Sequence, residues 1–146
     1  MTCNCNTMKN NCRKSALRIS GSTPQAIGTT PSALSGAIAL VDTGCSMEAM
    51  ASGARICTAG LYEVSANVQA NVTTAGTVSA QIYLDGVPQP DTLRTVTAAV
   101  GLTVIPLETL LCLPGNCCCG HTVQVYVFGA AEGTVTLWAL DALRQA

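Results

Sequence analysis

Apolar and polar residues alternate strictly from Leu61 to Val72. Successive side chains of a strand lie on opposite faces of a sheet, so this period of two predicts a strand with one buried face. The predicted buried face carries Tyr62, Val64, Ala66, Val68, Ala70 and Val72. The opposite face carries Glu63, Ser65, Asn67, Gln69 and Asn71.

The same alternation returns several times along the chain. Residues 77–84 alternate after a turn at 73–76, which predicts a hairpin, and Asp85-Gly86 is a turn dipeptide because both residues tolerate positive φ. Further strands are predicted over 93–99, 102–113, 123–127 and 134–143, with weaker candidates over 37–41 and 54–58. These seven or eight short strands, without a convincing helix, predict an all-β antiparallel sandwich or barrel. The core is predicted to contain Tyr62, Val64, Val68, Ile82, Leu84, Val123, Val125 and Val127.

The last predicted strand is apolar on both faces. Val135, Leu137 and Ala139 share one face, which we assign to the sandwich core. Trp138, Leu140 and Ala142 share the other face. A strand that is apolar on both sides must be covered on both sides, so these three residues are predicted to contact another subunit.

Residues 1–33 are rich in Asn, Ser, Thr, Gly and Pro and show little periodicity, which predicts an extended arm. Four of the seven bases, Lys9, Arg13, Lys14 and Arg18, lie in the first 18 residues, where there is no acid. The arm therefore either attaches to an acidic surface or acts as a solvated tail. Its start has no apolar run after the bases, so we do not expect it to act as a secretory signal.

Charge is unusually scarce in the chain as a whole. Hydrophobic residues make up 49% of the 146 residues and charged residues only 10%, against about 25% in an ordinary domain. No apolar stretch is long enough for a membrane-spanning helix, and a net charge of −1 offers nucleic acid no attraction. We therefore expect the surface to be covered by other copies in a homo-oligomer, with no membrane or nucleic-acid partner.

Nine cysteines and one histidine are the candidate metal ligands. Cys117, Cys119 and His121 lie within five residues, and thiolate and imidazole suit zinc. The spacing contains no Cys-x-x-Cys pair, so clustered thiols or a disulfide are favoured over a metal, and no cofactor is predicted. The count is odd, so at least one thiol stays unpaired within the chain, binds a metal or pairs between chains.

The sequence contains no recognisable catalytic constellation. It holds no Gly-x-Ser-x-Gly, phosphate-binding loop or His-Glu-x-x-His, and its acids are scattered. The chain is therefore predicted not to be an enzyme. Tyr62 and Tyr83 could stack on sugars, although a strand tyrosine is more often buried or half-buried.

Three short motifs carry a resemblance to a known superfamily. They are the strand opening Thr58-Ala59-Gly60-Leu61-Tyr62-Glu63-Val64-Ser65, the hairpin tip Tyr83-Leu84-Asp85-Gly86-Val87-Pro88 and the loop Leu113-Pro114-Gly115-Asn116. Together with the alternating strands over roughly 34–144, they resemble the jelly-roll modules of the tumour-necrosis-factor and complement globular-head superfamily. The resemblance implies an arm over 1–33 and a jelly-roll domain over 34–146.

The resemblance also implies a quaternary structure and a role. It implies a homotrimer with the last strand near the threefold axis, and with Glu63, Ser65 and Asn67 turned toward other subunits. Phage and bacterial versions of the module are similar in their Ala-, Val- and Thr-rich strands. They imply a virion protein, a capsid decoration or head fibre attached by its arm to a larger assembly such as a capsid. The alternative is a receptor- or glycan-binding tip of a phage fibre or spore-surface filament, using loops near 85–91 and 116–121.

Overall fold

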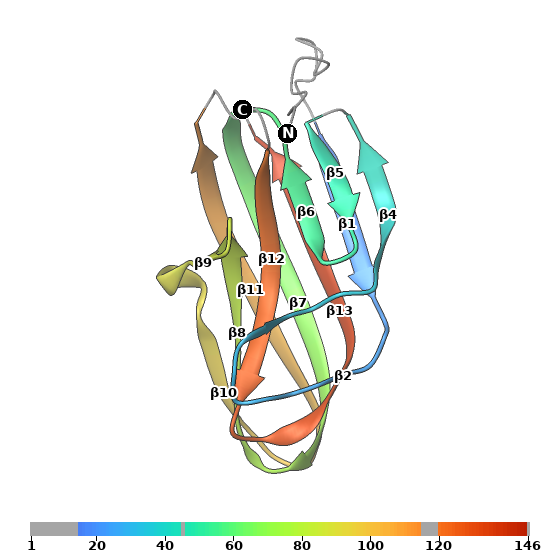
Figure 1. Cartoon of the computed structure of the whole chain (residues 1–146), viewed down its shortest axis with the longest axis vertical. Helices are drawn as coiled ribbons and strands as arrows, with labels where there is room; N and C mark the ends of the chain where they lie inside the picture. Colours follow the sequence, from blue (N-terminus) through green and yellow to red (C-terminus); the bar gives the residue numbers. More distant parts are fainter. Residues whose placement is uncertain (1–14, 45, 115–119, 146) are drawn as a thin grey trace.

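The computed structural model describes residues 15–44, 46–114 and 120–145. Strands account for 73% of these described residues, and they form two antiparallel sheets packed face to face as a sandwich (Figure 1). The all-β jelly roll predicted from the sequence is therefore confirmed. Within the described residues, no helix is long and apolar enough to cross a membrane.

Five strands form the main part of the first sheet, in the order β11-β7-β13-β1-β4. Their bounds are β1 (Ala16–Gly21), β4 (Ala37–Thr43), β7 (Gly60–Thr74), β11 (Gly101–Leu113) and β13 (Glu132–Arg144), and the short β2 (Gln25–Ala26) pairs with β13. The second sheet has the order β10-β8-β12-β6-β5. The bounds of its strands are β5 (Met47–Met50), β6 (Gly53–Ile56), β8 (Gly76–Leu84), β10 (Arg94–Ala98) and β12 (His121–Gly129). The short β3 (Ser32–Ala33) pairs with β12, and the short β9 (Val87–Pro88) pairs with β8. The 3₁₀ turn η2 (Pro90–Thr92) lies between β9 and β10.

The predicted hairpin of residues 61–72 with 77–84 is wrong, because the chain passes from the first sheet to the second between β7 and β8. The core between the sheets nevertheless follows the predicted alternation. The six apolar residues of β7 from Tyr62 to Val72 are buried, and the polar residues between them face outward. Seven of the eight predicted core residues are buried, whereas Leu84 at the end of β8 is only partly buried against the core. Asp85 and Gly86 have φ of +52° and +78° and join β8 to β9, so the turn predicted at this dipeptide is confirmed.

The predicted faces of β13 are reversed. A β-bulge between Val135 and Leu137 places one extra residue against β7, and a single extra residue exchanges the two faces of a strand. Val135 is therefore buried, but Leu137 turns outward with 39% of its surface exposed. Trp138, Leu140 and Ala142 lie in the core, each only 1% exposed, so placing them at a subunit interface was wrong.

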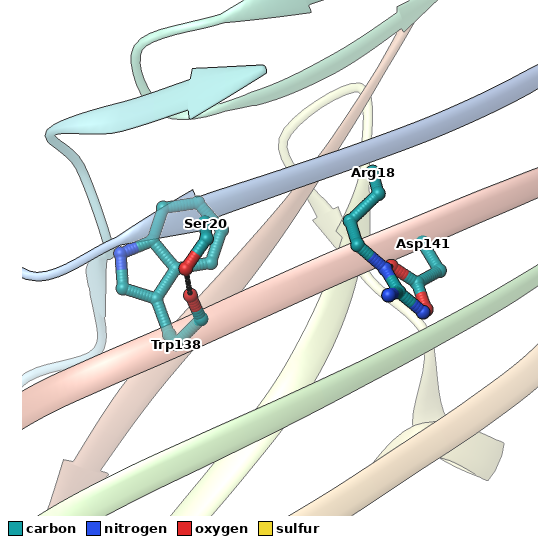
Figure 2. A network of polar contacts seen from close by, with 4 residues as sticks. All are labelled: Arg18, Ser20, Trp138 and Asp141. Atoms are coloured by element: carbon teal, nitrogen blue, oxygen red, sulfur yellow. Dashed lines mark hydrogen bonds and ion pairs between the residues drawn. The ribbon is translucent and has the colours of Figure 1, made fainter. Parts of the chain in front are cut away.

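Trp138 is held in the core by a close fit to β1. Its indole Nε1 donates a hydrogen bond to the carbonyl oxygen of Ser35, 3.1 Å away. Gly21 lies against the same ring, and a methyl group added there would meet Nε1 at 2.2 Å. Ser20, one residue earlier, donates from its hydroxyl to the Trp138 carbonyl (Figure 2).

The prediction of an arm over residues 1–33 is wrong for its second half. β1 lies inside the first sheet, paired with β13 on one side and β4 on the other (Figure 1). Leu17 and Ile19 are buried in the core. The sheet therefore begins at Ala16 rather than at residue 34, and residues 1–14 lie outside the described part of the chain.

Candidate subunit interface

The outer face of the first sheet carries the polar residues predicted to meet other subunits. Glu63, Ser65 and Asn67 all point away from the core, so the predicted register of β7 is confirmed. In the direction across the sheet, Ser65 has Glu108 of β11 on one side and Asp141 of β13 on the other. Contact of these residues with another subunit stays a prediction.

Exposed apolar side chains are concentrated on this sheet. Of the eleven large hydrophobic residues found exposed in the described chain, eight lie on its strands. Ile38, Leu40 and Val41 form a group on β4, which we call the β4 rim. Leu102, Val104 and Leu110 form a group on β11, the β11 rim. Leu137 and Leu143 on β13 lie between them.

A shallow groove runs over the outer face between the two rims. Its middle part has a volume of about 300 Å³ and is lined on this face by Ser65, Asn67, Pro106, Glu108, Ala139 and Asp141. A smaller hollow of about 80 Å³ shares Asn67 and Ala139 and extends to Ser20 and Leu137. We call these two joined hollows the outer groove. The groove exists because Ser20, Ser65 and Ala139 are too small to fill the face between the rims.

One end of the groove is acidic. Glu108 also lines a wider hollow of about 570 Å³, together with Glu63 and Asp91. Two of these carboxylates accept hydrogen bonds from neutral donors: Glu63 from the Gln145 amide at 2.9 Å and Asp91 from the Thr109 hydroxyl at 3.2 Å. These bonds fix the positions of the Glu63 and Asp91 carboxylates.

An ion pair crosses the outer face beside the groove. Arg18 of β1 binds Asp141 of β13 through two parallel contacts, Nε to Oδ1 at 2.8 Å and Nη2 to Oδ2 at 2.9 Å (Figure 2). The hydrogen bonds and then the charge of Asp141 raise the pKa of Arg18 above its usual value. Arg18 is thus a sheet residue with an internal partner, and not part of an attachment arm. The other predicted attachment residues, Lys9, Arg13 and Lys14, lie outside the described residues.

His121 is the first residue of β12 and contacts a turn residue. Its Nδ1 is 2.7 Å from Oδ2 of Asp85, whose Oδ1 accepts a hydrogen bond from the Thr122 amide at 2.8 Å. The other ring nitrogen, Nε2, is buried and has no hydrogen-bond partner among the described residues. The remaining weak metal candidates, Cys117 and Cys119, lie outside them, and the described residues contain no group of three potential metal ligands.

The positions of the tyrosines do not favour the sugar-stacking hypothesis. Tyr62 is buried, and its hydroxyl donates to the Thr58 carbonyl at 2.7 Å. Tyr83 is partly exposed and stacks on Tyr126, with ring centroids 3.7 Å apart and planes 10° from parallel. Each ring therefore turns one face to the other ring, which leaves fewer open faces for a sugar.

The sequence reasoning missed both rims, although their signal was present. Residues 102–113 are apolar at even as well as odd positions, because Leu102, Val104 and Leu110 interleave with the buried set. Residues 37–41 are apolar without any alternation. A strand that is apolar on both faces needs cover on both faces. That argument was applied to the last strand alone.

Comparisons with known proteins support the fold. No protein-family model and no curated protein matches the chain. Among solved structures, the PRD1 vertex protein P5 is similar over 90% of this chain and 97% of its own, with a TM-score of 0.64 and 16% identity. The Eiger TNF of S. frugiperda is similar over 92% and 94%, with a TM-score of 0.68 and 8% identity. The globular domain of zebrafish complement 1qA is similar over 90% and 99%, with a TM-score of 0.61 and 12% identity. The chain has the jelly-roll fold of the tumour-necrosis-factor and complement globular-head proteins.

Proposed function

We propose that this protein is a non-enzymatic structural protein of a virus particle and that it works as a homotrimer. The observation that carries the proposal is the concentration of exposed apolar side chains on one sheet face. Monomeric proteins rarely leave large apolar patches uncovered, and patches rimmed by polar residues mark interaction sites. The low charge content supports the same conclusion, because 10% charged residues give a monomer few groups with which to stay soluble.

The role in a particle rests on likeness of fold. The PRD1 vertex protein P5 shares the sandwich over nearly the whole of both chains, and the resemblance described above includes phage decorations and head fibres. A fold can host many functions, so the role in a particle is proposed by analogy alone. The oligomer is proposed from the exposed apolar surface of the chain itself. Attachment through the bases of residues 1–14 is part of the proposal.

Two measurements test the two parts separately. Light scattering after gel filtration is expected to give three times the chain mass of 14.9 kDa, and a stable monomer at micromolar concentration contradicts the oligomer. Cryo-electron microscopy of purified particles is expected to show trimeric density on the capsid surface. Particles that lack the protein contradict the virion role even if the isolated protein is a trimer.

A further inference from the structure

We propose that Tyr83 and Tyr126 form an oxidative cross-linking site, at which a one-electron oxidant couples the two rings into dityrosine within one chain. The oxidant is hydrogen peroxide acting through a haem peroxidase. Both residues lie on the outer face of the second sheet, away from the outer groove and the two rims. The inference therefore goes beyond the proposed homotrimer and holds for a single chain as well.

The second sheet brings the two rings together from distant parts of the chain. β8 and β12 are neighbouring strands, with Tyr83 opposite Gln124 and Tyr126 opposite Gln81. Tyr83 and Tyr126 are thus diagonal neighbours on one face, and residues in this relation are about 7–8 Å apart, within reach of aromatic side chains. Both rings point outward, because their neighbours along each strand pack into the core.

The rings lie closer together than neutral aromatic rings prefer. Their centroids are 3.7 Å apart and their planes are 10° from parallel. Carbon atoms in contact stay about 3.5–4.0 Å apart, so the two rings overlap almost fully. Aromatic pairs prefer offset or edge-to-face arrangements with centroids about 4.5–7 Å apart. The pairing of the strands, and not attraction between the rings, therefore holds this arrangement.

The arrangement prepares the pair for coupling. Coupling joins two ring carbons, and reacting atoms held about 3–3.5 Å apart are close to the geometry of reaction. The separation of 3.7 Å between the Tyr83 and Tyr126 rings is near that range. Both side chains are partly exposed, so an oxidant in solution can reach them. The third tyrosine of the chain, Tyr62, is fully buried in the core.

The coupling consumes one molecule of hydrogen peroxide for each pair of rings. Each phenol gives up one electron and its hydroxyl proton and becomes a phenoxyl radical. The two electrons and two protons reduce the peroxide to two molecules of water. A carbon–carbon bond then forms between the ring carbons beside the two hydroxyls. The hydrogen atoms on those carbons move to the oxygens, which restores both phenols.

The cross-link joins the two middle strands of the second sheet covalently. It closes a loop of about 40 residues between Tyr83 and Tyr126. A cross-link of this span lowers the entropy of the unfolded chain, as a disulfide between the same positions does. For a chain of this size, the melting midpoint of the cross-linked protein is expected to rise by roughly 10 °C.

Peptide mapping after oxidation tests the site directly. The wild-type protein is treated with a haem peroxidase and an excess of hydrogen peroxide over its nine cysteines, because thiols also react with peroxide. Dityrosine fluorescence is expected to appear. Mass spectrometry of the digested protein is expected to find the peptides of Tyr83 and Tyr126 joined, and lighter by two hydrogen atoms than their sum.

The controls remove one phenol at a time. Tyr83→Phe and Tyr126→Phe keep a ring at each position, so both variants are expected to fold, as judged by circular dichroism, and to give no product within the chain. Tyr62→Phe is the matched control and is expected to give the full yield. N-acetyltyrosine amide in the same mixture shows that the oxidant is active.

Three results would overturn the inference. The first is an active oxidant that leaves the wild-type tyrosines uncoupled. The second is coupling mainly between chains, seen as covalent dimers. The third is an equal yield of dityrosine from Tyr83→Phe and from the wild type. Peptide mapping of the wild type decides the matter even if a variant unfolds, and neither a monomer nor a trimer in light scattering affects the outcome.

Discussion

Replacing Gly21 by alanine is expected to destabilise the fold through a single methyl group. An added Cβ would lie 2.2 Å from Trp138 Nε1, 2.8 Å from Cε2 and 3.0 Å from the Ser35 carbonyl oxygen. The indole must move, and it then weakens its hydrogen bond to Ser35. Overpacking a core costs about 1–3 kcal/mol and a buried group left without its partner about 1–3 kcal/mol. Because the two effects overlap, we expect a total of about 2–4 kcal/mol.

This cost converts into a measurable fall in melting temperature. The strands span about 130 residues from Ala16 to Arg144, and at about 2.1 cal/mol/K per residue the unfolding entropy is roughly 0.27 kcal/mol/K. The midpoint should therefore fall by roughly 7–15 °C. Trp138 is the only tryptophan, so its fluorescence follows the perturbed ring directly.

Two comparisons make the Gly21 prediction specific. Gly28→Ala is the matched control, because the nearest atom to its added Cβ is 4.0 Å away, and it should leave the midpoint nearly unchanged. In a Trp138→Phe background the smaller ring leaves room, so Gly21→Ala should cost less there than in the wild type. Equal costs in both backgrounds, or no difference from Gly28→Ala, refute the close fit between Gly21 and Trp138.

Three further predictions follow from polar contacts. Burial raises the pKa of Tyr62 above its usual value of 10.0, so in alkali the unfolded chain loses this proton first and the stability of the fold decreases as pH rises above about 10. Tyr62→Phe should therefore flatten the curve of unfolding midpoint against pH in this range, and an unchanged slope contradicts the prediction. Asp85→Ala should cost about 1–2 kcal/mol in chemical denaturation, because it removes the acceptor of His121 and of a backbone amide, whereas Asp85→Asn, which keeps one oxygen acceptor and tolerates positive φ, should cost less. If the outer face is covered in the trimer, Arg18→Ala should weaken association more than the double change Arg18→Ala/Asp141→Ala, because the single change leaves the Asp141 carboxylate covered and unpaired. Association is measured by light scattering on dilution. If the face is open to water, the double variant should instead dissociate more readily than the single variant.

Sequence periodicity predicted the strands whose alternation is unbroken. β7 alternates over its whole length, so both its buried residues and its outward residues were assigned correctly. In β13 the bulge inserts one residue, and no local sequence signal marked it, because both faces are apolar. Pattern reasoning therefore found the strand but exchanged its faces, and the predicted interface residues were the wrong set.

The first strand was missed for a different reason. β1 is only six residues long, and Arg18 and Ser20 alternate with just two large apolar residues, Leu17 and Ile19. So short a run within a polar, glycine-containing region resembles a loop. Its strand structure comes from pairing with β13 and β4, about 120 and 20 residues further along the chain. Long-range pairing of this kind cannot be read from local composition.

The central position of β13 also determines when the protein can fold during its synthesis. β13 lies between β7 and β1, yet it is translated after every other strand of the two sheets. About 110 residues separate the end of β1 from the start of β13, and at about 5–20 residues per second a ribosome needs roughly 5–20 s to make them. Hairpins such as β5–β6 can form within about 10 μs, but β1 and β7 have no shared neighbour until β13 emerges. The nascent chain therefore keeps the edges of two strands open for seconds, and a chaperone bound before β13 is made would protect it at the stage when it is most prone to aggregate.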